Sequence, residues 1–255
     1  MLLNPNASEA KITPVFMLIT TKGIVFSALK YAEADLIVKC FTERAGLKTY
    51  LLRGVLKSKK GKLKASLFQP LTQLELVASH KDKGTLEYIK EAKIHSPYQS
   101  LHTNVIKSTV VMFLAEVLRN SVREEEANIA LYDFLEESLD WFDSHEKTVN
   151  FHLLFLVKLT RYLGFYPDDY QKDVPVFNLV EGTFQEVETN PDCINDENVS
   201  LLQRLLGTDF DELSALKLNQ AGRSGFLLML LRYYEIHLQG FHKPKSLTVL
   251  NEIYS

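Results

Sequence analysis

The sequence has little cysteine, no long apolar run and no secretion signal, and each absence excludes a class of protein. Its 255 residues include two cysteines, Cys40 and Cys193, so a disulfide framework or a cysteine zinc cluster is not expected. No stretch of 18 apolar residues is present to span a bilayer. Glu9 and Lys11 stand where a signal peptide needs its apolar centre. We therefore expect a cytoplasmic protein with no membrane partner.

The common catalytic and nucleotide-binding motifs are also missing. There is no GxGxxG loop, no Walker A loop and no GxSxG elbow, and the seven histidines form neither HExxH nor HxH. The acidic pairs Asp168-Asp169 and Asp209/Asp211 lack a loop of regularly spaced oxygen donors, so they are more typical of a turn and a helix cap. We expect a protein that is not an enzyme and that holds no cofactor and no metal.

The charge is divided unevenly along the chain, although the formal net charge is only -3. Up to Ser96 there are 14 Lys and 2 Arg against 8 acidic residues. From Pro97 onward, 13 basic residues stand against 24 acidic ones. This asymmetry suggests that the first part of the molecule binds a polyanion and that the second part has another role.

Apolar and polar residues alternate between Ile19 and about Ile94 with the period of two that is typical of strands. About five such runs, separated by short turns, fit a small five-stranded barrel such as the OB-fold. The predicted strands are residues 23–29, 36–41, 49–52, 73–79 and 85–89.

After Pro97 the apolar residues follow the period of amphipathic helices, which predicts a helical domain. The predicted helices are residues 106–117, 131–142, 151–163 and 225–238. Within this domain, the Glu181-Gly182 turn between apolar residues predicts a small inserted β-hairpin. The predicted fold class is α+β, with a five-stranded OB-fold barrel followed by helices. The predicted domains are a flexible extension at 1–16, the OB-fold at 17–96 and the helical domain at 97–255, with its insert at about 166–198.

The basic segment, residues 53–64, is the clearest functional signal. It holds six cations and no acidic residue, and its two glycines let the backbone approach a phosphate chain. A solvated loop that only aids solubility is the alternative, but a position after the hairpin of a small barrel favours nucleic acid. The candidate DNA-binding residues are Arg53, Lys57, Lys59, Lys60, Lys62 and Lys64, with Tyr31 and Tyr50 as rings that could stack on bases.

Several runs of the sequence, taken in order, resemble a known family. In the first half they are Thr21-Lys-Gly-Ile-Val, Tyr31-Ala-Glu-Ala-Asp-Leu-Ile-Val38, Thr42-Glu-Arg-Ala-Gly46, Arg53-Gly54 followed by lysines, and Gln69-Pro70 before Leu74-Glu75-Leu76. Near the end they are Leu231-Arg-Tyr-Tyr-Glu-Ile-His-Leu238 and Lys243-Pro-Lys-Ser246. From Met17 onward, the order and spacing of these runs resemble the RecO family of bacterial recombination mediators.

The resemblance implies a non-catalytic role in DNA repair and recombination, in association with the bacterial nucleoid. It implies that residues 17–96 bind single- and double-stranded DNA and anneal DNA strands. The implied protein partners are the acidic C-terminal tail of SSB, RecR and, indirectly, RecA, which replaces SSB. An acidic tail needs a local basic surface, for which we select Arg119, Arg123 and Arg161 because guanidinium groups bind carboxylates with two hydrogen bonds. Alternatively, these arginines only pair with neighbouring acidic residues.

One region departs from the family, and one alternative function stays open. Many members hold a four-cysteine zinc site where this chain has Cys193 alone. We expect a metal-free insert, stabilised by its hairpin and by its apolar residues Val176, Phe177, Leu179 and Phe184. The alternative function is a protein-interaction adaptor whose OB-fold does not bind DNA. A hydrolase is disfavoured because the motifs for it are missing.

Overall fold

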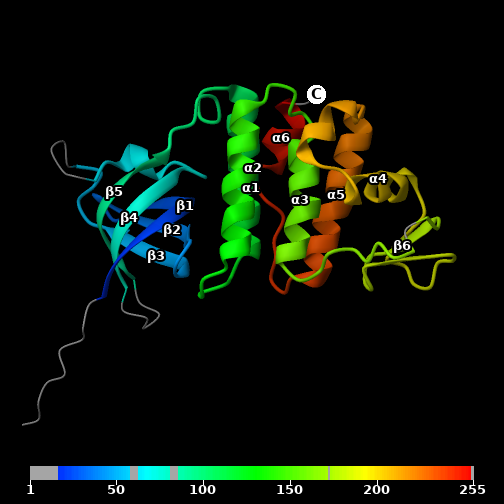
Figure 1. The fold of residues 1–255 in the computed structure, drawn as a ribbon, viewed down its shortest axis with the longest axis horizontal. Helices are drawn as coiled ribbons and strands as arrows, with labels where there is room; N and C mark the ends of the chain where they lie inside the picture. Colours follow the sequence, from blue (N-terminus) through cyan, green and yellow to red (C-terminus); the bar gives the residue numbers. More distant parts are fainter. Residues whose placement is uncertain (1–16, 58–62, 81–85, 172, 254–255) are drawn as a thin grey trace, which may run out of the picture.

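A five-stranded antiparallel sheet forms the N-terminal part of the chain (Figure 1). The computed structural model describes residues 17–57, 63–80, 86–171 and 173–253, so the predicted extension 1–16 lies outside the described residues. The strands are β1 Met17–Tyr31, β2 Asp35–Thr42, β3 Gly46–Leu52, β4 Gln73–His80 and β5 Tyr88–Ser96, in the order β3-β2-β1-β4-β5.

The sheet curls until its two edge strands touch. Tyr50 of β3 forms a parallel bridge with Glu87, directly before β5, and Leu51 N–H donates to the Glu87 carbonyl at 2.9 Å. Alternate residues such as Val38 and Cys40 face inward, and the 3-10 helix η1, Ala65–Phe68, adds Phe68 to the same core. The structure therefore confirms the predicted OB-fold, with edges joined at a bridge instead of along a continuous ladder.

Helices form the second part of the molecule, as predicted (Figure 1). They are α1 Val105–Ser121, α2 Ile129–Ser144, α3 Phe151–Tyr162, α4 Glu197–Leu206, α5 Gln220–His237 and α6 Leu247–Ile253, with a 3-10 helix η2 at Phe210–Ala215. No described helix is long and apolar enough to cross a bilayer.

The last long helix begins earlier than the sequence predicts. The side chain of Asn219 accepts a hydrogen bond from Gly222 N–H, which caps α5 so that the helix starts at Gln220 and not at Gly225. The prediction was wrong because it began the helix at Gly225, whereas Gly222 and Gly225 both lie within the first turns of α5.

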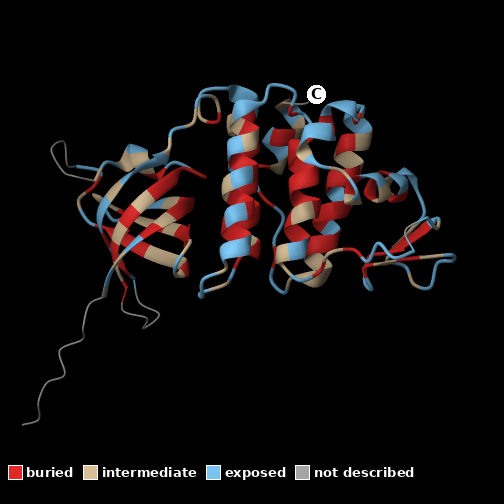
Figure 2. Ribbon diagram, viewed as in Figure 1, coloured by how far each residue is buried: buried red, intermediate tan, exposed pale blue. Residues whose placement is uncertain are grey.

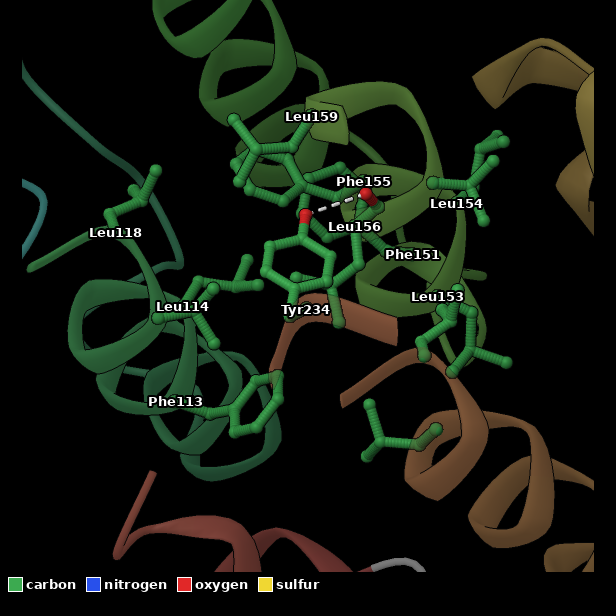
Figure 3. Packing of buried hydrophobic residues seen from close by; sticks show 14 of the residues in the cluster. Phe113, Leu114, Leu118, Phe151, Leu153, Leu154, Phe155, Leu156, Leu159 and Tyr234 are labelled. Atoms are coloured by element: carbon green, nitrogen blue, oxygen red, sulfur yellow. Dashed lines mark hydrogen bonds between the residues drawn. The ribbon is translucent and has the colours of Figure 1, made fainter. Parts of the chain in front are cut away.

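The helical core is rich in aromatic residues, and buried positions line the inward faces of the helices (Figure 2). Tyr234 of α5 lies at its centre, fully buried beside residues of α1 and α3 (Figure 3). Its hydroxyl group donates to the Leu156 carbonyl at 2.8 Å, so the one polar atom of this side chain is satisfied inside the core.

The OB-fold and the helices share part of one core. Ile24, Phe26, Phe41 and Leu71 belong to the same buried cluster as the helical residues, and the Phe41 ring stacks on Tyr132 of α2 with centroids 6.3 Å apart. Polar contacts surround this apolar junction. They include Lys22 to Glu136 at 3.0 Å, Leu47 N–H to the Glu124 carbonyl at 2.7 Å and the Tyr98 hydroxyl to the Leu71 carbonyl at 2.9 Å.

The predicted insert forms a three-stranded sheet, with strands β6 Val176–Asn178, β7 Thr183–Gln185 and β8 Cys193–Ile194 in the order β7-β6-β8. The hairpin was predicted, whereas β8 was not, because two residues give no periodicity to detect. Gly182 has a φ of +68°, and a Cβ there would meet the Tyr233 hydroxyl at 2.7 Å. The turn therefore requires glycine, both for its conformation and for its packing against α5.

Candidate nucleic-acid interface

The basic segment starts at the end of β3 and leads to η1. Its first residues are fixed to the β1–β2 turn, because Gly54 N–H donates to Asp35 Oδ1 at 2.8 Å and Leu56 N–H donates to the Ala34 carbonyl at 2.9 Å. Val55 is buried in the core of the OB-fold and anchors the segment. These contacts fix the position of the segment up to Lys57, the last residue described before 58–62.

Half of the predicted cations can be placed. Arg53, Lys57 and Lys64 are exposed, as a phosphate contact requires. Lys59, Lys60 and Lys62 fall within 58–62, outside the described residues, and their role stays a prediction. Lys57 pairs with Glu33 at 2.7 Å, but both side chains are mostly exposed, so water and salt weaken this pair.

The two predicted stacking tyrosines differ in exposure. Tyr31 is 52% exposed at the end of β1, so a base can reach its ring. The prediction for Tyr50 was wrong, because this ring is fully buried and its hydroxyl hydrogen-bonds His80 Nε2 at 2.8 Å. Tyr50 stands opposite Val38 in the β2–β3 register and shares its inward direction. Burial raises the pKa of the Tyr50 hydroxyl above its usual range.

Tyr88, the first residue of β5, is an exposed aromatic residue that the sequence analysis did not select. The Arg53 guanidinium lies 5.8 Å from its ring centroid and donates to its hydroxyl at 3.4 Å. The alternation of Tyr88 with buried Ile89 could have identified it as outward-facing. Its contact with Arg53, 35 positions away, depends on how the sheet curls.

Further lysines on the OB-fold are available to an anion. Lys30, Lys39, Lys64 and Lys90 make no ion pair with any residue that the structure describes. Lysines that no described carboxylate neutralises keep their charge for phosphate groups, which supports a positive field on this part of the molecule.

The three arginines selected on the helices do not line one site. Arg123 donates to the Gln239 carbonyl after α5, and Arg161 lies over the Tyr166 ring at 4.2 Å. Arg161 lines a groove between α2, α3 and η2, whereas Arg119 and Arg123 do not. The groove has a volume of about 620 Å³ and is lined by Phe134, Glu137, Ser138, Trp141, Lys158, Arg161, Tyr162, Tyr166 and residues 206–211.

The groove combines aromatic walls with charges of both signs. Lys158 pairs with Asp209 at 2.8 Å, and this pairing lowers the pKa of the Asp209 carboxyl group. The Trp141 indole donates to Asp211 at 2.6 Å. Arg161 is the groove cation whose side chain engages a ring and not a carboxylate.

The insert does not fit a zinc ion of the kind the family resemblance implies. Within the described residues, no group of three or more His, Cys, Asp or Glu side chains is placed to hold a metal ion. Cys193 Sγ instead accepts hydrogen bonds from Gln185 Nε2 at 3.2 Å and Thr189 N at 3.5 Å. Desolvation acts to raise the pKa of Cys193, but hydrogen bonds from Thr189 and Asn190 lower it. The absence of zinc from the protein stays a prediction.

Comparison with known proteins covers nearly the whole described chain. Residues 17–98 match the family model "Recombination protein O N terminal", and residues 102–247 match "Recombination protein O C terminal". The DNA repair protein RecO of Christiangramia forsetii is 61% identical over 93% of this chain and 100% of its own length. That of Flavobacterium psychrophilum is 47% identical over 94% of this chain, and that of Bacteroides fragilis is 36% identical over 93%, each again over its full length.

Proposed function

The chain belongs to the RecO family of DNA repair proteins, and on this premise we propose that its OB-fold binds and anneals DNA strands without catalysis. One observation supports this proposal above the others. The basic segment starts from an anchored turn on the OB-fold, and its first cation, Arg53, contacts the exposed ring of Tyr88. A cationic track beside exposed aromatic rings is how OB-folds bind single strands.

Annealing of this kind needs no general acid or base. Lysine and arginine side chains reduce the repulsion between two phosphate backbones, and counterion release favours the bound state. Exposed rings hold a single strand by transient stacking, which leaves its bases able to pair. The residues required are therefore cations and exposed rings, and the OB-fold supplies both.

We infer protein partners from the same membership. The C-terminal tail of SSB, RecR and, indirectly, RecA would meet this protein at DNA in the bacterial cytoplasm, where it helps RecA replace SSB. The groove offers aromatic walls and Arg161 to an acidic peptide that ends in phenylalanine. Arg119 and Arg123 would have to act outside the groove.

DNA affinity as a function of salt tests the main proposal. Changing Lys59, Lys60, Lys62 and Lys64 together to Glu should largely abolish binding and flatten the slope of log affinity against log salt, by roughly one unit for each phosphate group that the variant no longer neutralises. A matched control changes four exposed cations of the helical domain, Lys147, Arg204, Lys217 and Lys245, to Glu. Binding that survives in the first variant, or is absent from the parent protein, would contradict the proposal and leave the adaptor function.

A peptide titration tests the partner proposal on the full-length protein. Replacing Arg119, Arg123 and Arg161 together by Ala should weaken binding of a peptide copy of the SSB tail, because each guanidinium can hold a carboxylate. Arg161→Ala alone should account for the effect if the groove is the site. Unchanged affinity in the triple variant would show that these arginines have only structural roles.

A further inference from the structure

We propose that Tyr88 and Arg53 together form a stacking step for one base of a single DNA strand. The inference rests on the proposed DNA-binding function and adds to it the residue that contacts a base. The step lies at the seam, defined here as the place where Tyr50 and Glu87 bridge the two edges of the sheet.

The seam fixes the direction of the Tyr88 ring. Glu87 N–H donates to the Thr49 carbonyl at 2.8 Å, and Leu51 N–H donates to the Glu87 carbonyl at 2.9 Å. The side chains of Tyr50 and Glu87 are buried. Because successive residues of a strand point to opposite faces, Tyr88 points outward from the seam.

The ring is both accessible and beside a cation. Tyr88 is 37% exposed, and the Arg53 guanidinium lies 5.8 Å from its centroid. An aromatic face stacks on any base, and a guanidinium group beside it can contact the adjoining phosphate or stack on the same base. Arg53 is also the first residue of the basic segment, and exposed Lys57 follows it four positions later.

Charge favours Tyr88 over Tyr31 as the stacking ring. Tyr31 is more exposed, but it stands opposite Asp35 in the β1–β2 register and lies two residues before exposed Glu33. Two carboxylates beside a ring repel the phosphate groups that flank a base. Tyr88 instead has Arg53 beside it and exposed Lys90 two residues further along β5.

Stacking on Tyr88 should distinguish single strands from duplexes. The bases of a duplex already stack on each other, whereas those of a single strand are free to stack on a side chain. Cations act on the phosphates of both forms. Removal of the Tyr88 ring should therefore weaken single-strand binding selectively.

The experiment compares Tyr88→Ala and Tyr88→Phe in the full-length protein, with oligo(dT) and a duplex of equal length as probes. We expect Tyr88→Ala to weaken oligo(dT) binding by about 5- to 150-fold, the range for removing one base–aromatic stack, and to change duplex binding little. Tyr88→Phe keeps the ring and should stay near the parent. Tyr170→Ala removes a tyrosine of the insert that is 87% exposed and serves as the matched control.

A fluorescence readout keeps the test independent of small changes in affinity. Trp141 is the only tryptophan, so Tyr88→Trp in a Trp141→Phe background places a single indole at the seam. Saturation with oligo(dT) should quench its emission, while saturation with duplex should not. Thermal melting of each variant confirms that it is folded.

Different results would contradict the stacking role of Tyr88 and the proposed DNA-binding function. Unchanged oligo(dT) affinity in Tyr88→Ala, together with loss of binding in the quadruple lysine variant, would overturn the stacking step and leave DNA binding intact. An equal loss of single-strand and duplex affinity would also overturn it. A parent protein that binds neither probe would overturn the proposed function itself.

Discussion

Basic side chains are used differently in the two halves of the molecule. On the helices, Lys107 donates to Ser100 Oγ and to the Asp143 carbonyl, and Arg223 donates to Asn150 Oδ1 and to the Leu218 carbonyl. On the OB-fold, Lys30, Lys39, Lys64 and Lys90 have no ion pair within the described part of the chain. A cation with several protein partners stabilises the fold, whereas one without them remains available to a ligand. The difference holds for these two sets of residues, since other lysines of the OB-fold, such as Lys22 with Glu136 and Lys93 with Glu75, are paired.

Removing one arginine from each half tests this difference most directly. Arg223 is 9% exposed, so Arg223→Ala leaves the buried Asn150 Oδ1 and the part-buried Leu218 carbonyl without this donor, and it should lower the free energy of unfolding by about 3 kcal/mol. Arg53→Ala, at an exposed position, should change it by less than about 0.5 kcal/mol while weakening DNA binding. Equilibrium urea denaturation measures both values. Equal destabilisation of the two variants would refute the distinction.

A buried histidine of the helical half should make that half sensitive to acid. Burial, with a smaller contribution from Arg223, lowers the pKa of His152 from 6.5 to about 3. The unfolded chain therefore binds a proton below about pH 6.5 that the folded protein excludes, so stability falls as the pH drops. The loss due to His152 should reach about 2 kcal/mol at pH 5.

Urea denaturation at pH 7 and pH 5 measures this loss. Between pH 7 and pH 5, the free energy of unfolding of His152→Leu should fall by about 2 kcal/mol less than that of the parent protein, since all other titratable groups are unchanged. His242→Leu, at an exposed position, is the control and should follow the parent. A pH dependence that is identical in parent and His152→Leu would exclude His152 as its source.

Two tyrosines of the OB-fold differ in burial, since Tyr50 is buried and Tyr31 is exposed. Tyr50→Phe removes the buried hydrogen bond to His80 and should cost about 1 kcal/mol of stability with no change in DNA affinity. Tyr31→Phe, at an exposed ring, should leave stability as it was. Equilibrium urea denaturation of the two variants measures these changes, and equal stability of Tyr50→Phe and Tyr31→Phe would contradict the distinction between the buried and the exposed ring.

The smallest effect is expected at the insert. We predict that the purified protein contains no stoichiometric zinc and that a chelator leaves its melting temperature unchanged, because Cys193 hydrogen-bonds Gln185 and Thr189. Cys193→Ser should cost at most about 1 kcal/mol. Metal analysis that found one zinc per chain would contradict this prediction.

Periodicity in the sequence predicted the fold class. Which side chains contact one another across the fold could be determined only from the structure. The stripe of Val110, Phe113 and Val117 identifies α1 because a helix repeats its apolar face locally. Tyr50 was predicted as a ring that stacks on bases, whereas the strand register directs it inward against His80. The contact between Arg53 and Tyr88 forms only when the sheet edges meet, so no local pattern of the sequence contains it.

The stack of Phe41 on Tyr132 has a consequence for cooperativity. Because the OB-fold and the helices bury these rings in one cluster, neither half can unfold without exposing apolar surface of the other. Thermal denaturation should follow a single transition, and amides on both sides of the junction should exchange hydrogen with similar protection. A helical fragment that begins near Pro97 would leave Tyr132 facing water. Truncation at this point should therefore yield neither half in its native state.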